Sequence, residues 1–174
     1  MDPHASLDAL QRFAAIERLV AKVYFRFSHL FLGRPELRDF WWQMAMDEEQ
    51  HACVLLACRE VSGDEIEEVL PPKEVREKAD WFESQLNAYL SKGTRSISVE
   101  KAFEIALEIE GSELDTIYER LLFSGGPHMA KAMEKLGVPT GVQKEKLKSA
   151  ILRFSMEPHL RAAAEGLKAD TRED

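Results

Sequence analysis

The sequence has few cysteines, and their placement excludes a disulfide-stapled or thiolate-rich protein. The only two, Cys53 and Cys58, are five residues apart on one predicted helix. Side chains at this spacing point to different sides of a helix, so we do not expect them to form a disulfide bond with each other. No Cys-x-x-Cys pair is present. This cysteine usage is typical of a cytoplasmic protein with reduced thiols.

Long apolar runs and excess positive charge are also missing. No apolar run approaches the roughly 20 residues of a membrane helix, and residues 1–13 lack the basic-then-apolar order of a secretory signal. The chain has 23 Lys and Arg against 31 Asp and Glu, a net charge of −8. This balance argues against nucleic acids and anionic membranes as partners. A length of 174 residues with 45% hydrophobic content suits one globular domain.

Helical periodicity dominates what the sequence does contain. The predicted helices cover about residues 7–32, 35–61, 72–92, 99–123, 127–136 and 141–167. Thr140 and Gln143 have the spacing of a capping box at the start of the last helix, and Pro158 is expected to kink or split that helix. No alternating run favours a β-strand. We therefore predict a single all-α domain over 1–174, an antiparallel four-helix bundle with one long crossover that contains the extra helix 72–92.

Acidic and histidine side chains interrupt the apolar stripes of the four long helices. The residues concerned are Glu17, Glu48, His51, Glu110, Glu113 and His159. An unpaired carboxylate in a core costs on the order of several kcal/mol if it stays ionised. The simplest explanation for any single one is a residue at the rim of the core or half of an ion pair. Because the pattern recurs on four helices and no Lys or Arg shares these stripes, we predict a pair of metal ions between the helices.

The spacing of Glu48 and His51 fits this prediction. Residues three apart lie side by side on a helix, so both side chains can reach one ion. Oxygen and nitrogen ligands without thiolate favour iron or manganese, with zinc as an alternative. Glu49 lacks this spacing and is expected on a solvated face. Tyr24 is expected in the core, where its hydroxyl can hydrogen-bond to a ligand carboxylate.

The two halves of the chain are similar to each other. The segment AAIERLVAKVYFRF aligns with LEIEGSELDTIYERL and matches Glu17 with Glu110. The segment MDEEQHACVL aligns with RFSMEPHLRA and matches His51 with His159. Each half would then supply ligands from one helix pair, and the two pairs would be related by a pseudo-twofold axis.

With these motifs the sequence resembles the ferritin-like di-iron carboxylate superfamily, and within it the rubrerythrin branch. The resemblance spans all four long helices and rests on Glu17, Glu48-x-x-His51, Glu110-x-x-Glu113 and His159. It implies that the glutamates of the first and third helices are ligands and that Glu48 bridges two irons. His51 and His159 would each bind one ion. Glu113 would be an extra ligand that exchanges with a histidine as the iron changes oxidation state.

The resemblance implies an oxidoreductase that reduces peroxide or reacts with dioxygen, commonly as a homodimer. Two departures qualify it. Met156 stands three residues before His159, where a glutamate is expected, and the adjacent Glu157 points elsewhere on a regular helix. Without a Cys-x-x-Cys pair there is no rubredoxin-type iron site, so electrons would come from a separate donor protein. The alternatives are an iron-binding or storage protein, a degenerate ferritin-like scaffold with one metal or none that acts through partners, and a helical bundle for another ligand.

Overall fold

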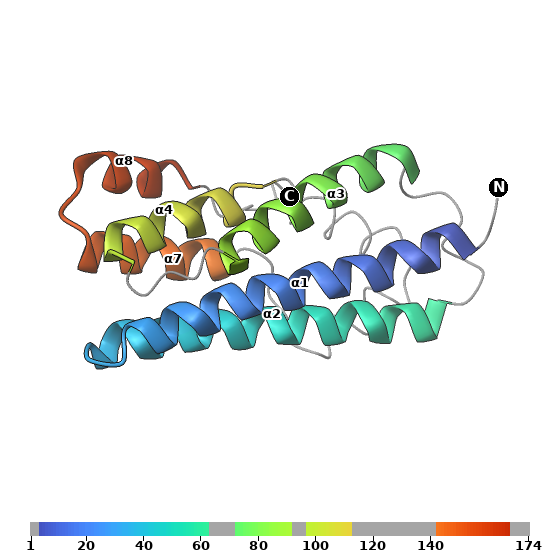
Figure 1. The fold of residues 1–174 in the computed structure, drawn as a ribbon, viewed down its shortest axis with the longest axis horizontal. Coiled ribbons are helices and arrows are strands. Elements are labelled where there is room, and N and C mark those ends of the chain that lie inside the picture. Colours follow the sequence, from blue (N-terminus) through green and yellow to red (C-terminus); the bar gives the residue numbers. More distant parts are fainter. Residues whose placement is uncertain (1–3, 63–71, 92–96, 113–141, 168–174) are drawn as a thin grey trace, which may run out of the picture.

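The computed structural model describes residues 4–62, 72–91, 97–112 and 142–167. The described helices are α1 (His4–Leu30), α2 (Pro35–Ser62), α3 (Pro72–Ser91), α4 (Val99–Glu110), α7 (Val142–Phe154) and α8 (Pro158–Gly166) (Figure 1). These residues contain no β-strand. The predicted all-α class is therefore confirmed for the part of the chain that the structure describes.

Helices α1 and α2 form a long antiparallel pair (Figure 1). They are joined by a short turn in which the Arg34 backbone N–H donates to the Phe31 carbonyl at 2.8 Å. Proline is well suited to a first helical turn, and α2 begins at Pro35 as predicted. The indole ring of the fully buried Trp41 on α2 lies 5.0 Å from the Phe27 ring and 5.3 Å from the Phe103 ring. This aromatic cluster joins α1, α2 and α4.

Helix α3 is the predicted extra helix, and it packs along α1. The Arg12 side chain on α1 pairs with Asp80 and with Glu83, the latter at 2.9 Å. Further along α1, the Arg26 guanidinium donates to the Leu90 carbonyl at 2.7 Å. Arginine side chains from α1 therefore hold the middle and the C-terminal end of α3 in place.

Helix α4 begins where the sequence predicted but ends early. Ser98 is its N-cap, and the Ser98 hydroxyl accepts a hydrogen bond of 3.1 Å from the Lys101 backbone N–H. The helix ends at Glu110, whereas we expected it to continue through Gly111 to Phe123. The Ser112 hydroxyl donates to the Ile109 carbonyl at 2.6 Å, and the Ser112 backbone N–H donates to the same carbonyl at 3.1 Å, a tighter turn than that of an α-helix. Residues 113–123 and the predicted helix 127–136 lie outside the described residues.

The predicted last helix is split at Pro158. Helix α7 ends at Phe154, and α8 begins at Pro158 and folds back beside α4 (Figure 1). Proline at the start of α8 leaves the carbonyls at the end of α7 without their helical donors. The Arg161 guanidinium takes over, donating to the Leu152 carbonyl at 2.6 Å and to the Ser155 carbonyl at 3.1 Å. The split decides where the residues after Ser155 point.

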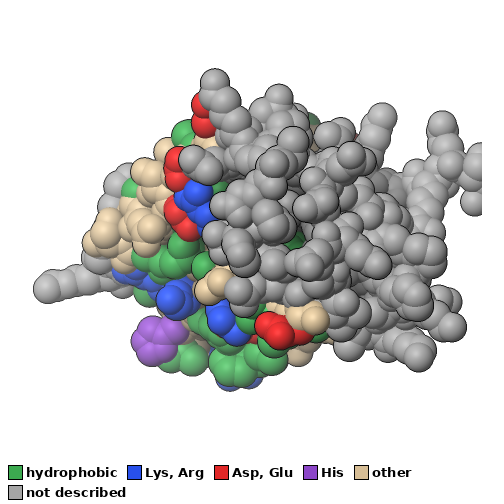
Figure 2. Space-filling model, turned by 90° about the vertical axis from the view of Figure 1, so that its right-hand side faces the viewer, with side chains coloured by type: hydrophobic (Ala, Val, Ile, Leu, Met, Phe, Trp, Pro, Cys, Tyr) green, Lys and Arg blue, Asp and Glu red, His purple; other side chains and the backbone are tan. Residues whose placement is uncertain are grey.

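The surface of the described residues carries both signs of charge. In the end-on view of Figure 2, acidic and basic side chains are interspersed among apolar ones. None of the described helices combines the length and apolarity needed to cross a membrane.

Candidate metal centre

Three of the predicted ligands converge between α1 and α2. One carboxylate oxygen of Glu17, one of Glu48 and one ring nitrogen of His51 all lie within 4.8 Å of one another. Glu48 is buried, with 3% of its surface exposed, and His51 is partly buried. The Glu48 Oε2 atom lies 3.2 Å from His51 Nδ1. Two carboxylates and an imidazole in this arrangement form a group that can hold a metal ion; we refer to it as the Glu17–Glu48–His51 group.

Local sequence explains why this group forms. Glu48 and His51 share one face of α2 because residues three apart are neighbours on a helix. Residues at equal distances from the turn of a helical hairpin lie opposite each other. Glu17 lies 15 residues before Leu32, and Glu48 lies 15 residues after Gly33. The tight turn between the helices therefore sets the register that brings Glu17 to Glu48.

Gln143 on α7 is a further contact of the group that the sequence did not reveal. Its Nε2 donates a hydrogen bond of 2.8 Å to Glu48 Oε1, and only 8% of the residue is exposed. The sequence had instead predicted that Gln143 forms a capping box with Thr140 at the start of its own helix. Thr140 lies outside the described residues. The missed signal was its spacing. Gln143 stands four and seven residues before the buried Leu147 and Ala150, on the inner stripe of α7.

Glu110 is buried as predicted but has a different neighbour. It is 2% exposed, and the Tyr24 hydroxyl donates to its Oε1 at 2.7 Å. Tyr24 therefore lies in the core as expected, with its hydroxyl bonded to a buried carboxylate. Glu110 is not among the residues whose ligand atoms converge with Glu48 and His51. Glu113, which was predicted as a second ligand on the same helix, lies outside the described residues.

His159 is not on the inner face, and that prediction is wrong. Its side chain is 61% exposed, with Nε2 3.6 Å from Glu104 Oε1 and Nδ1 3.8 Å from Glu157 Oε2. Met156 is 87% exposed. The reason is the split at Pro158, because α8 does not continue the helical phase of α7. Lys101 chiefly, and His159 to a smaller extent, lower the pKa of Glu104, as expected for a surface charge cluster.

The charged residues next to the group form ion pairs with basic residues of α1 and α7. The Lys146 ammonium lies 2.5 Å from Asp47 Oδ2 and links α7 to α2. Arg18 Nε lies 3.8 Å from Glu49 Oε2 across the α1–α2 pair. Glu49 is half-buried and lies outside the Glu17–Glu48–His51 group, in agreement with its lack of the i, i+3 spacing.

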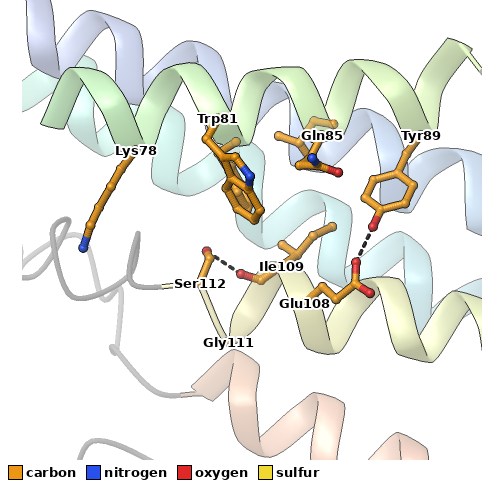
Figure 3. A pocket seen from close by; sticks show the side chains of 10 residues that line it. Lys78, Trp81, Gln85, Tyr89, Glu108, Ile109, Gly111 and Ser112 are labelled. Carbon is orange, nitrogen blue, oxygen red and sulfur yellow. Dashed lines mark hydrogen bonds between the residues drawn. The ribbon is translucent and has the colours of Figure 1, made fainter. Parts of the chain in front are cut away.

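A separate cavity of about 480 Å³ lies between α3 and the end of α4 (Figure 3). Apolar side chains form most of its wall, and Trp81 points into it from α3. The Tyr89 hydroxyl donates to the Glu108 carboxylate on one side of the cavity (Figure 3). Burial, together with this hydrogen bond, raises the pKa of Tyr89 to about 12. None of the Glu17–Glu48–His51 residues lines the cavity.

Comparisons of the chain with protein-family models, with curated proteins and with solved structures found no match. The geometry of the Glu17–Glu48–His51 group and the chemistry of its side chains are therefore what indicate a metal centre.

Proposed function

We propose that this protein binds iron at Glu17, Glu48 and His51 and that the iron reacts with peroxide or dioxygen. One observation carries the proposal: ligand atoms from two helices lie within 4.8 Å of one another in the interior of a helix pair. Two carboxylates at such a distance repel each other when ionised, and a divalent cation between them offsets the repulsion. The arrangement is best suited to holding a cation.

The donor set fits iron. Carboxylate oxygens and an imidazole nitrogen suit ferrous and ferric ions, and they also accept manganese or zinc. When bound, iron supplies the redox chemistry. Glu17, Glu48 and His51 would hold the iron, and the iron would supply the reaction with a small oxidant.

The wider resemblance to ferritin-like, rubrerythrin-type proteins belongs to the same proposal. The antiparallel α1–α2 hairpin, with Glu17 on one helix and Glu48-x-x-His51 on the other, supports it. In this proposal the later helices complete an antiparallel four-helix bundle. The protein works in the cytoplasm as a homodimer and receives electrons from a separate donor protein.

The test compares two histidine substitutions. The protein is loaded anaerobically with ferrous iron, and iron content and peroxide consumption are measured for the wild type, His51→Ala and His159→Ala. We expect His51→Ala to weaken iron binding by at least about 100-fold and to abolish turnover, because it removes a ligand. His159→Ala is the matched control and should behave as the wild type. Equal iron binding in both variants would contradict the proposal.

A second candidate function is iron binding or storage, or a scaffold role with one metal or none. The exposed positions of His159 and Met156 favour it, because the fourth-helix ligands of a two-iron enzyme are not in the interior. Iron binding that depends on His51 without any consumption of peroxide or dioxygen would support storage over catalysis.

A further inference from the structure

Large apolar side chains are exposed on the outer face of the α1–α2 hairpin. On α2, Trp42 is 51% exposed and Met46 is 44% exposed, although the neighbouring Trp41 and Ala45 are buried. The Trp42 ring lies 5.0 Å from the ring of the half-buried Phe25 on α1. Tryptophan and methionine side chains at the centre of an exposed face are typical of a protein–protein interface.

Two stripes of side chains make up this outer face. Within each stripe the residues are three or four apart, so they lie along one line of their helix. The stripe on α1 consists of Arg18, Lys22, Phe25 and His29, and the stripe on α2 consists of Asp39, Trp42, Met46, Glu49 and Cys53, all of them exposed or half-buried. The Phe25–Trp42 ring contact and the Arg18–Glu49 ion pair at 3.8 Å show that the stripes lie side by side. We refer to the two stripes together as the hairpin face.

The two stripes carry opposite charge. The α1 stripe contains Arg18 and Lys22 and no acidic residue, whereas the α2 stripe contains Asp39 and Glu49 and no basic residue. Asp39 also pairs with Arg38 of its own helix at 2.8 Å, and its side chain is still 65% exposed. A twofold rotation places the basic stripe of one copy on the acidic stripe of another. The hairpin face is therefore complementary in charge to a second copy of itself.

We propose that the hairpin face is the contact surface of a symmetric dimer of this chain. This inference rests on the homodimer of the proposed function and not on its metal ion. The twofold axis passes through the Phe25–Trp42 contact, so Phe25 of each copy packs on Trp42 of the partner subunit. Lys22 lies three residues before Phe25, and Asp39 lies three residues before Trp42. The rotation that exchanges the two rings therefore brings Lys22 to Asp39 of the partner subunit.

Two charge variants test this arrangement by analytical ultracentrifugation. Lys22→Glu and Asp39→Lys each bring like charges together twice in a symmetric dimer, so each variant alone should dimerise at least about 10-fold more weakly than the wild type. An equal mixture of the two variants should form a heterodimer as stable as the wild-type dimer, because both contacts then join opposite charges. A mixture that associates no better than its separate components would overturn the proposed arrangement.

The apolar centre of the hairpin face gives an independent test. Trp42→Ser should raise the dissociation constant of the dimer at least about 100-fold, because it removes the largest apolar side chain of the contact. Trp81→Ser is the matched control, since Trp81 is 59% exposed on α3, and it should dimerise as the wild type does. Circular dichroism checks that both variants keep their helices.

A monomeric wild type, or a Trp42→Ser variant that dimerises as strongly as the wild type, would overturn the proposal. The hairpin face would then be left to another segment of the chain or to a partner of another kind. Iron binding, measured on the same samples, separates this failure from that of the metal centre. A monomer that binds iron contradicts only the dimer surface, and a dimer that binds no iron contradicts only the metal centre.

Discussion

The Tyr24 hydroxyl on α1 donates a hydrogen bond of 2.7 Å to Glu110 Oε1 on α4, across a sequence separation of 86 residues. Both residues are buried. A carboxylate in a core is tolerated when hydrogen-bond donors replace its hydration. This hydrogen bond is therefore part of what attaches the α1–α2 hairpin to the later helices.

Replacing Tyr24 by Phe should destabilise the protein by about 1.5–3 kcal/mol, the range for hydrogen bonds to charged groups. Glu110 loses a donor in a place that water does not readily reach. The measurement is urea-induced unfolding followed by circular dichroism. Tyr89→Phe provides a matched control, since its partner Glu108 is exposed and can be rehydrated. The control should cost less than about 1 kcal/mol, and equal losses in the two variants would contradict this account of Glu110.

Glu17→Gln should change stability in opposite directions with and without metal. In metal-free protein the substitution removes the repulsion between Glu17 and Glu48, so we expect the free energy of unfolding to rise by roughly 1–2 kcal/mol. With Mn²⁺ at about 100 times its dissociation constant, the wild type should gain about 2.7 kcal/mol. The variant should gain much less. Thermal unfolding with chelator and with Mn²⁺ measures both effects, and the same sign under both conditions would contradict a metal role for Glu17.

Trp41 should tolerate loss of its indole nitrogen far better than loss of its ring. Among the described residues, its buried Nε1 has no hydrogen-bond partner, while its ring packs against Tyr24, Phe40 and Phe103. We expect Trp41→Phe to cost about 1–2 kcal/mol and Trp41→Ala about 3–5 kcal/mol. Urea unfolding distinguishes them. Similar costs for the two variants would contradict the view that contacts of an aromatic ring at this position provide most of the stabilisation.

The Tyr89 hydroxyl should make the protein sensitive to alkaline pH. Its pKa is raised to about 12, mainly by burial, from the value near 10 of an unfolded chain. The folded state favours the neutral hydroxyl, so its contribution is fully present below about pH 10 and is lost as the pH rises towards about 12. We expect the free energy of unfolding to fall more steeply above about pH 10 in the wild type than in Tyr89→Phe. Parallel pH profiles for the two proteins would contradict the raised pKa.

Features that depend on local spacing could be predicted from the sequence. The positions of glycine and proline residues predicted the turn before Pro35 and the break at Pro158. The i, i+3 spacing of Glu48 and His51 predicted a shared face, and the short turn placed Glu17 opposite them. The Glu17–Glu48–His51 group could be predicted because α1 and α2 belong to one hairpin, whose register is set by the turn alone.

The early end of α4 was harder to predict. The apolar periodicity continues past Gly111, and in the structure the bonds of the Ser112 hydroxyl and backbone N–H to the Ile109 carbonyl mark the end of the helix. Such side-chain hydrogen bonds depend on rotamers and neighbours, which periodicity does not contain.

The sequence by itself determined an all-helical chain and a hairpin that brings two carboxylates and an imidazole together. The tertiary structure alone decided what surrounds them. Gln143 reaches Glu48 from α7, and Tyr24 binds Glu110 on α4. His159 faces solvent because Arg161 caps the broken end of α7 and α8 turns away. These contacts join helices far apart in the chain, so they depend on how whole helices pack and not on the spacing within any one of them.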